Sequence, residues 1–132
     1  MAYQWNKAWE IGYPLVDAQH KMLIHKYNSF IVACASGKGK VELMGAINFL
    51  LSYTVEHFSD EEALQIQINY PHYDKHKMQH DTFKMGAEKL ASRLEKEGPS
   101  ARLVVQFNAD IGDWLIRHIK TEDARLTSYI KN

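Results

Sequence analysis

Residues 76–94 of the chain read HKMQHDTFKMGAEKLASRL and contain the clearest helical pattern in the sequence. Apolar or histidine side chains recur there after three or four residues, the spacing that places them on one face of an α-helix. Gly98 and Pro99 then break the pattern. The stretch predicts an amphipathic helix whose buried face carries two histidines, and that face consists of His76, His80, Phe83, Ala87, Leu90 and Leu94.

Three other long segments show the same spacing and are separated by short breaks. The first follows Asp17, its expected N-cap, and ends at Gly37. The second runs from about Val41 to Tyr70, and the fourth begins after Ser100, which we expect to cap it. Because short connections favour antiparallel neighbours, we predict an all-α protein with an up-down-up-down four-helix bundle.

The two ends of the chain depart from this pattern. A short helical extension is expected after Thr121. The chain of 132 residues is long enough for one domain with its own core, so we expect a single domain over residues 1–132. The N-terminal residues are predicted to form an arm packed on the bundle, since their exposure would be unfavourable; the aromatic and apolar residues of this arm are Trp5, Trp9, Ile11 and Tyr13.

Composition and charge exclude several classes of function. Sixteen basic and sixteen acidic residues cancel, which argues against binding to nucleic acid. The N-terminus lacks the cationic and apolar regions of an export signal, and no segment reaches the roughly 18 apolar residues of a membrane span. We therefore expect a soluble, cytoplasmic protein without membrane insertion. The single cysteine, Cys34, excludes an internal disulfide framework and a cysteine-based metal site.

Five of the seven histidines lie on the predicted buried faces together with two acids. A lone histidine in such a position is usually satisfied by one hydrogen bond. Burying this whole set without a metal would leave many polar atoms unpaired, at about 1 to 3 kcal/mol each. Helical bundles build metal sites from such facing side chains. The predicted ligands of a two-metal site are His20, His57, Glu61, His76, His80, His118 and Asp123.

Counting these ligands predicts two unequal metals. If both acids bridge, the third and fourth helices give three histidines to one metal, while His20 and His57 remain for the other. With a bridging oxygen added, the first metal is closed, whereas the second keeps a vacant position where a small ligand can bind. Nitrogen and oxygen ligands suit iron, and also manganese, zinc or copper.

The spacing between His118 and Asp123 conflicts with a regular helix. Residues five apart are separated by roughly 140° around an α-helix. For both side chains to reach one metal site, the helix must loosen or end between them, for example by a π-like turn.

The chain resembles the bacteriohemerythrins, the single-domain bacterial form of the hemerythrin family. The resemblance implies two non-haem irons joined by a bridging oxo or hydroxo group, with Glu61 and Asp123 as bridging carboxylates. It also implies that O2 binds reversibly at the iron held by His20 and His57. The motifs that carry the resemblance are VDxQHK at 16–21, HFxxEE at 57–62, YP at 70–71 before HxxxH at 76–80, WLxxHI at 114–119, and Asp123.

Family members surround the bound O2 with apolar groups, and the corresponding residues here are Phe58, Trp114, Leu115 and Ile119. Such a wall excludes water that would release the ligand and leave the irons oxidised. Gln65 departs from the family, which commonly has methionine there. Its amide lies one helical turn from Glu61, where it can bond that carboxylate, hold a water or turn outward.

Two alternatives to an oxygen carrier, storage or delivery protein stay open. One is a di-iron oxidase or peroxidase, but such sites use Glu-x-x-His motifs, and the chain contains none. The other is a module that senses O2 or redox state; sensory hemerythrins are usually fused to output regions, for which this chain has no room. We expect a protein that is not an enzyme, with O2 as its ligand and an oxygenase or reductase as a possible protein partner.

Overall fold

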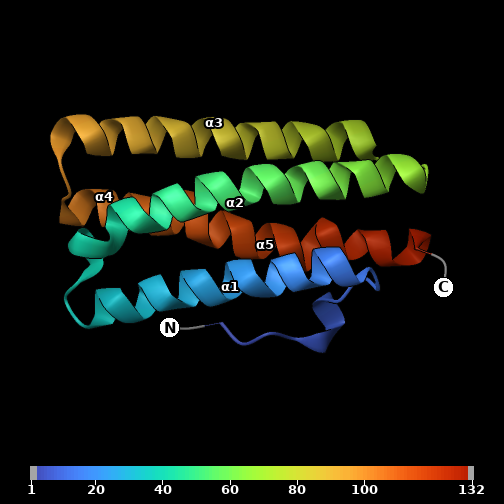
Figure 1. Ribbon diagram of the computed structural model, residues 1–132, viewed down its shortest axis with the longest axis horizontal. Coiled ribbons are helices and arrows are strands. Elements are labelled where there is room, and N and C mark those ends of the chain that lie inside the picture. The colour runs from blue at the N-terminus through green and yellow to red at the C-terminus, as the bar shows by residue number, and fades with distance from the viewer. Residues whose placement is uncertain (1–2, 131–132) are drawn as a thin grey trace.

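Four helical segments lie side by side in the computed structural model, which describes residues 3–130 (Figure 1). The outermost residues of the predicted domain, 1–2 and 131–132, lie outside the described part. Because the connections are short, consecutive segments run antiparallel, and the predicted all-α, up-down-up-down bundle is confirmed. The segments are α1 (Pro14–Ala35), α2 (Gly39–Gln67), α3 (Tyr73–Glu97), and a fourth made of α4 (Ala101–Phe107), a π-helical turn (Asn108–Gly112) and α5 (Asp113–Thr121).

The ends of these helices follow from local chemistry, with one correction. Ser100 caps α4 as predicted, since its hydroxyl accepts a hydrogen bond from the Leu103 N–H at 3.2 Å. The prediction that Asp17 caps α1 was wrong. Helix α1 begins one turn earlier at Pro14, whose fixed φ suits a first helical position. The buried Asp17 carboxylate instead accepts from the N–H groups of Ile11 and Gly12, at 2.8 and 3.1 Å, and ties the preceding segment to the helix.

The fourth segment changes its helical form twice. The π-helical turn ends at Gly112, where a Cβ would lie only 2.0 Å from the Tyr27 ring of α1. The Tyr27 hydroxyl donates to the Asn108 side chain at 3.0 Å. Helix α5 then ends at Thr121, and a 3-10 helix, η3 (Asp123–Tyr129), follows. Helix α5 ends before Asp123 as expected, but the π-helical turn ends at Gly112, before His118, and does not lie between His118 and Asp123.

The N-terminal residues form the predicted arm along α1 (Figure 1). The Tyr3 N–H donates to the Asn28 side chain at 2.7 Å, and the Asn28 amide donates back to the Tyr3 carbonyl at 2.6 Å. Trp5 and Trp9 pack against the core, and Ile11 is fully buried. The C-terminal extension is present as η3. Both predictions for the chain ends are confirmed.

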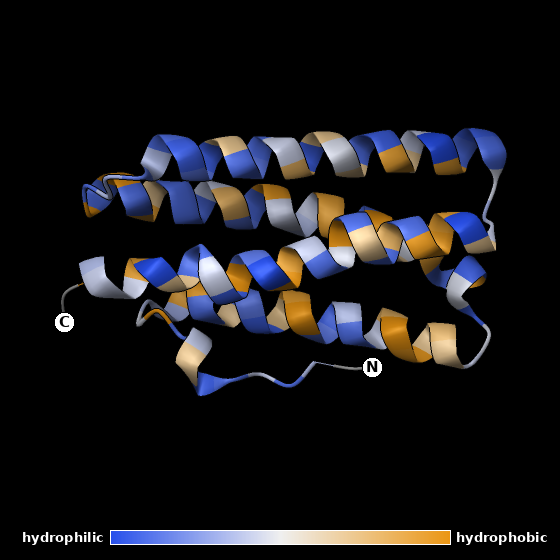
Figure 2. Cartoon of the chain, turned by 180° about the vertical axis from the view of Figure 1, so that it is seen from behind, coloured by the Kyte–Doolittle hydropathy of each residue, from blue (hydrophilic) through white to orange (hydrophobic). Residues whose placement is uncertain are grey.

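Hydrophobic and hydrophilic residues alternate along every helix, as expected of helices that bury one face (Figure 2). The largest apolar cluster starts at the end of the bundle where α1 ends and α2 begins, and it extends along the bundle to Phe58, Leu115 and Ile119. Within residues 3–130, no helix combines the length and the apolar character that crossing a bilayer requires. The residues of this cluster include Phe30, Leu43, Ile47, Leu50, Leu90, Leu94, Leu103 and Phe107.

Candidate metal centre

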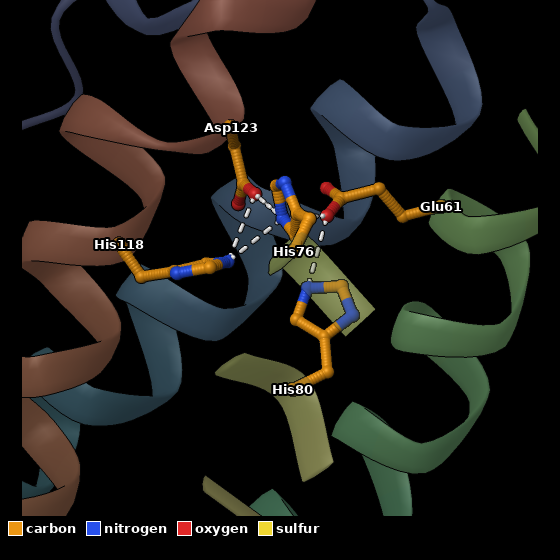
Figure 3. A group of neighbouring side chains, drawn as sticks. All are labelled: Glu61, His76, His80, His118 and Asp123. Carbon is orange, nitrogen blue, oxygen red and sulfur yellow. Dashed lines mark hydrogen bonds and ion pairs between the residues drawn. The ribbon is translucent and has the colours of Figure 1, made fainter. Parts of the chain in front are cut away.

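All seven predicted ligand residues meet at the other end of the bundle. They come from α1, α2, α3, α5 and η3, so the site depends on packing of every helical segment. Each of the seven is buried. Figure 3 shows five of them: Asp123 and Glu61 point toward each other from opposite sides, with His76 between them and with His80 and His118 completing the group. The seven residues are His20, His57, Glu61, His76, His80, His118 and Asp123.

The ligand atoms divide into two groups that share the two carboxylates. One group contains three histidines, His76, His80 and His118, with Glu61 and Asp123. The other contains His20 and His57 with the same two acids. We call these the three-histidine group and the two-histidine group. Within each group the ligand atoms lie within 4.8 Å of one another, so each group surrounds a space of the size of one metal ion.

The carboxylate oxygens are divided between the groups. Glu61 Oε1 lies 3.0 Å from His76 Nε2 and 3.2 Å from His80 Nε2, while its Oε2 lies 3.3 Å from His20 Nε2. Asp123 repeats the arrangement: its Oδ1 faces His76 at 2.9 Å and its Oδ2 faces His20 at 3.0 Å. Each acid thus presents one oxygen to each group, which is the arrangement of a bridging carboxylate.

Distances between nitrogen atoms also fit metal coordination. The Nε2 atoms of His20 and His57 are 3.1 Å apart, and those of His76 and His118 are 2.9 Å apart. Two ligands at right angles on one metal, each bonded at about 2.1 Å, would be separated by about 3.0 Å. Both oxygens of Glu61 and both of Asp123 are buried without a hydrogen-bond partner. The donor set and its unpaired atoms therefore fit two metal ions.

Hydrogen bonds outside the site orient two of the imidazole rings. Gln19 donates through Nε2 to the Asp60 carboxylate at 2.8 Å, which turns its amide oxygen toward His57 Nδ1, also at 2.8 Å. On the other side, the Glu62 carboxylate lies 2.8 Å from His80 Nδ1. Because both acceptors lack a proton to give, the Nδ1 atoms of His57 and His80 donate, and their Nε2 atoms face the site.

Protons balance the acids when no metal is bound. Burial disfavours a charged imidazole, but Asp123 and Glu61 outweigh it and raise the pKa of both His20 and His76 to about 10. His57 behaves differently, because burial lowers its pKa to about 4. Although burial opposes their charge, the neighbouring histidines hold the pKa values of Glu61 and Asp123 below their usual range. Metal binding must displace the protons of His20 and His76.

Two of the four apolar residues predicted around the ligand, Phe58 and Trp114, contact ligand rings. The Phe58 ring stacks on His80 with centroids 3.8 Å apart and planes 4° apart. The half-buried Trp114 stacks on His118 at 4.6 Å and 9°. Leu115 and Ile119 are fully buried in the main apolar cluster. Phe58 and Trp114 therefore cover rings of the three-histidine group, and contact of any of the four residues with O2 stays a prediction.

Gln65 is fully buried, and neither its amide nitrogen nor its amide oxygen has a hydrogen-bond partner. Of the three orientations considered from the sequence, outward rotation and a bond to Glu61 are therefore wrong. Binding of a water, the third alternative, stays a prediction; it would relieve the cost of a buried, unpaired amide.

Sequence reasoning missed the residues that support the ligands. Gln19 and Glu62 adjoin His20 and Glu61 in sequence, but each orients a ring on a different helix, so helical periodicity alone does not reveal the contact. A third support joins Gln79 to Glu122, whose carboxylate accepts from the Gln79 amide at 3.0 Å beside Asp123. The other two histidines, His25 and His72, are exposed and lie outside the site.

Comparison with known proteins agrees with this geometry. Residues 11–130 match the family model of the hemerythrin HHE cation binding domain. Myohemerythrin of Sipunculus nudus is 29% identical over 121 residues, covering 92% of this chain and 88% of that protein. Bacteriohemerythrin of Stenotrophomonas maltophilia is 28% identical over 135 residues, covering 96% and 80%. Hemerythrin subunit alpha of Lingula anatina is 27% identical over 122 residues, covering 92% and 89%. The chain belongs to the hemerythrin family.

Proposed function

We propose that this protein binds O2 reversibly at a non-haem di-iron centre and acts as an oxygen carrier, store or delivery protein. The observation that carries the proposal is the division of the two buried carboxylates, each of which directs one oxygen to a three-histidine group and one to a two-histidine group. Membership of the hemerythrin family supports iron as the metal.

In this proposal Glu61 and Asp123 would each hold both of two irons, which would also share an oxo or hydroxo group. His76, His80 and His118 would complete the ligands of one iron, while His20 and His57 would complete those of the other. With only two histidines, the second set would leave a position for O2. When bound, the irons would supply the electrons for O2 uptake.

The surrounding residues are proposed to keep water out. Phe58 and Trp114 cover two ligand rings by stacking, and the fully buried Leu115 and Ile119 add apolar surface beside them. An apolar wall disfavours the water and proton donors that would release the bound ligand and leave the irons oxidised. In contrast, the polar, unpartnered amide of Gln65 introduces a possible water position one turn from Glu61.

The ligand set favours a carrier over an enzyme. Five histidines and two acids give a site less rich in carboxylates than those of ferritin-like oxidases, and we propose that turnover of a substrate is not its function. An oxygenase that consumes the O2, or a reductase that restores ferrous iron, would be its protein partner, and the cytoplasm its location. An O2 sensor is the second candidate, because it would use the same ligand set.

Cycling the iron-loaded protein between air and nitrogen tests the proposal. We expect a visible absorption band that appears in air, disappears under nitrogen and returns over repeated cycles without consumption of a reductant. Rapid, irreversible bleaching or continuous peroxide consumption would instead support an enzyme or a sensor. A His25→Ala variant serves as the matched control, since His25 is exposed on the same helix as His20.

A further inference from the structure

The two histidine groups differ in what supports their rings from outside. His80, in the three-histidine group, directs its Nδ1 to the Glu62 carboxylate at 2.8 Å. His57, in the two-histidine group, directs its Nδ1 to the Gln19 amide oxygen at the same distance. One ring is therefore backed by a charged acceptor and the other by a neutral one.

The neutral acceptor is held in place by a charge that lies further away. The Gln19 amide donates to Asp60 at 2.8 Å, so a whole amide group separates that carboxylate from the His57 ring. Glu62 touches its ring directly, and its side chain is only 15% exposed, so solvent screens its charge incompletely. Electrostatic interactions fall with distance and screening, so the effect of Glu62 on His80 must exceed that of Asp60 on His57.

A hydrogen-bond acceptor at Nδ1 changes how strongly the Nε2 atom of the same ring binds a metal ion. A carboxylate that accepts from Nδ1 makes the imidazole a more basic ligand, and such outer partners commonly change metal affinity 10- to 100-fold. A more basic ligand stabilises the more highly charged state of a metal. The ring bonded to Glu62 should therefore favour ferric iron more strongly than the ring bonded to Gln19.

We propose that Glu62 and Gln19 are positioning residues that make the two irons unequal: Glu62 directs the first oxidation to the iron of the three-histidine group, and Gln19 keeps the iron of the two-histidine group ferrous. This inference rests on the proposed di-iron function.

The test uses a one-electron oxidant on the iron-loaded, fully reduced protein. Ferricyanide removes one electron from one ferrous ion and becomes ferrocyanide, without forming or breaking a bond. The two midpoint potentials are measured by spectroelectrochemical titration. The ferric ion in the half-oxidised protein is located from the paramagnetic shifts of the Nδ1–H protons of His57 and His80. The histidine rings are labelled with ¹⁵N, and each Nδ1–H signal is assigned from its loss when that histidine is substituted.

Two substitutions exchange the supports. In Glu62→Gln the carboxylate becomes an amide of the same shape, and we expect the first midpoint potential to rise by about 59 mV for a tenfold loss of ferric preference. Gln19→Glu is made together with Asp60→Asn, so that the new carboxylate faces an amide donor and not the Asp60 carboxylate. This pair of changes should lower the potential of the two-histidine iron, so that the two midpoint potentials move closer together. Adding Glu62→Gln to the pair should reverse the order of oxidation. Asp60→Asn alone is the control and should shift either potential less than Glu62→Gln does.

Binding of Co²⁺ to the metal-free proteins gives a readout independent of O2 binding. The wild type should bind two ions, and Glu62→Gln should weaken one of them 10- to 100-fold while leaving the other unchanged. Equal weakening of both ions, or equal shifts of both potentials, would indicate a structural role for Glu62 and would overturn the inference.

Failure of the inference and failure of the proposed function give different results. A wild-type protein that binds two irons and O2 reversibly, but whose potentials do not respond to either substitution, retains its function and refutes this inference. A wild-type protein that binds fewer than two irons refutes both. If Glu62→Gln does not fold, the variant with Gln19→Glu and Asp60→Asn decides, because the potential of its two-histidine iron must fall for the inference to hold.

Discussion

The two ends of this bundle use the same four helical segments in opposite ways. At one end, which we call the apolar half, side chains such as Phe30 and Phe107 pack edge to face at 4.9 Å. At the other end, the metal-site half, the helices bury histidines and acids beside a second, smaller apolar cluster that includes Val16, Leu64 and Leu126. Among residues 3–130, the buried side-chain atoms without hydrogen-bond partners belong to ligand residues or to Gln65 and Gln79.

This difference separates the source of stability from the source of function. Apolar burial stabilises the first half without any cofactor. The second half carries polar atoms that are unfavourable until a metal satisfies them. Substitutions in the apolar half should therefore lower stability, and substitutions in the metal-site half should impair metal and O2 binding. Each kind of substitution should have little effect on the property that depends on the other half.

The largest effect should come from removing a ligand. In His57→Ala the two-histidine group keeps a single histidine, so we expect one iron per chain and complete loss of the O2-dependent band. The expected melting curve retains a cooperative transition, because the apolar half is intact. Iron content and absorption are the measurements, and His25→Ala is the control. A His57→Ala protein that still binds O2 would show that the vacant position lies elsewhere.

Phe107→Ala tests the apolar half, where we expect a loss of stability without a loss of iron. Phe107 is fully buried in the apolar half, and truncation of such a ring costs about 3 to 5 kcal/mol in the free energy of unfolding. Denaturant unfolding measures this loss, and the folded fraction should still bind two irons. Val105→Ala is the matched control on the same helix, because Val105 is 68% exposed and should change stability by less than about 0.5 kcal/mol. A fully folded Phe107→Ala protein that binds fewer than two irons would contradict the separation of stability from metal binding.

The metal-free protein should lose stability as the pH rises. The pKa values of His20 and His76 are raised from 6.5 to about 10, so their contribution is complete below pH 6.5 and is lost as the pH approaches 10. The lowered pKa values of Glu61 and Asp123 contribute stability above pH 4.5, which is lost in more acidic solution.

The lowered pKa of His57 removes stability as the pH falls below 6.5, so the chelated protein should be most stable a little below pH 6.5. Metal ions replace the histidine protons, so the loaded protein should not show this alkaline loss. Thermal melts of both forms across the pH range test the prediction. A chelated protein that melts no lower at pH 9 than at pH 6 would contradict it.

Gln65→Met is the smallest change and acts on the border of the metal-site half. Methionine removes two buried, unpaired polar atoms, so the metal-free variant should be more stable by about 1 to 3 kcal/mol. It should also autoxidise more slowly, because the site loses a possible water position. Denaturant unfolding and the decay of the O2-dependent band measure the two effects. Equal autoxidation rates in both proteins would remove any role of Gln65 in oxidation.

Sequence reasoning predicted the seven side chains that meet because helical spacing determines which residues share a buried face. His76 and His80 illustrate this, since one helix sets both positions. The supports were not predictable in the same way. The Gln19 bond to His57 joins α1 to α2, and the Glu62 bond to His80 joins α2 to α3, so both depend on how the helices are rotated against each other.

The local form of the fourth segment was also beyond prediction from spacing. The π-helical turn ends at Gly112, where the Tyr27 ring of another helix takes the space of a side chain. The mistaken cap has a similar cause, because Asp17 binds N–H groups of the arm before the helix rather than those of its own first turn. In each case a contact with a distant or preceding segment decides the local structure.

We propose that seven buried side chains hold two irons, one of which has a free position for O2. Iron and O2 content measured on one sample tests it most directly. We expect two irons per chain, one O2 per two irons in air, and full release of O2 under nitrogen with both irons retained. A single iron per chain, or two irons with no O2 uptake by the reduced protein, would contradict the account.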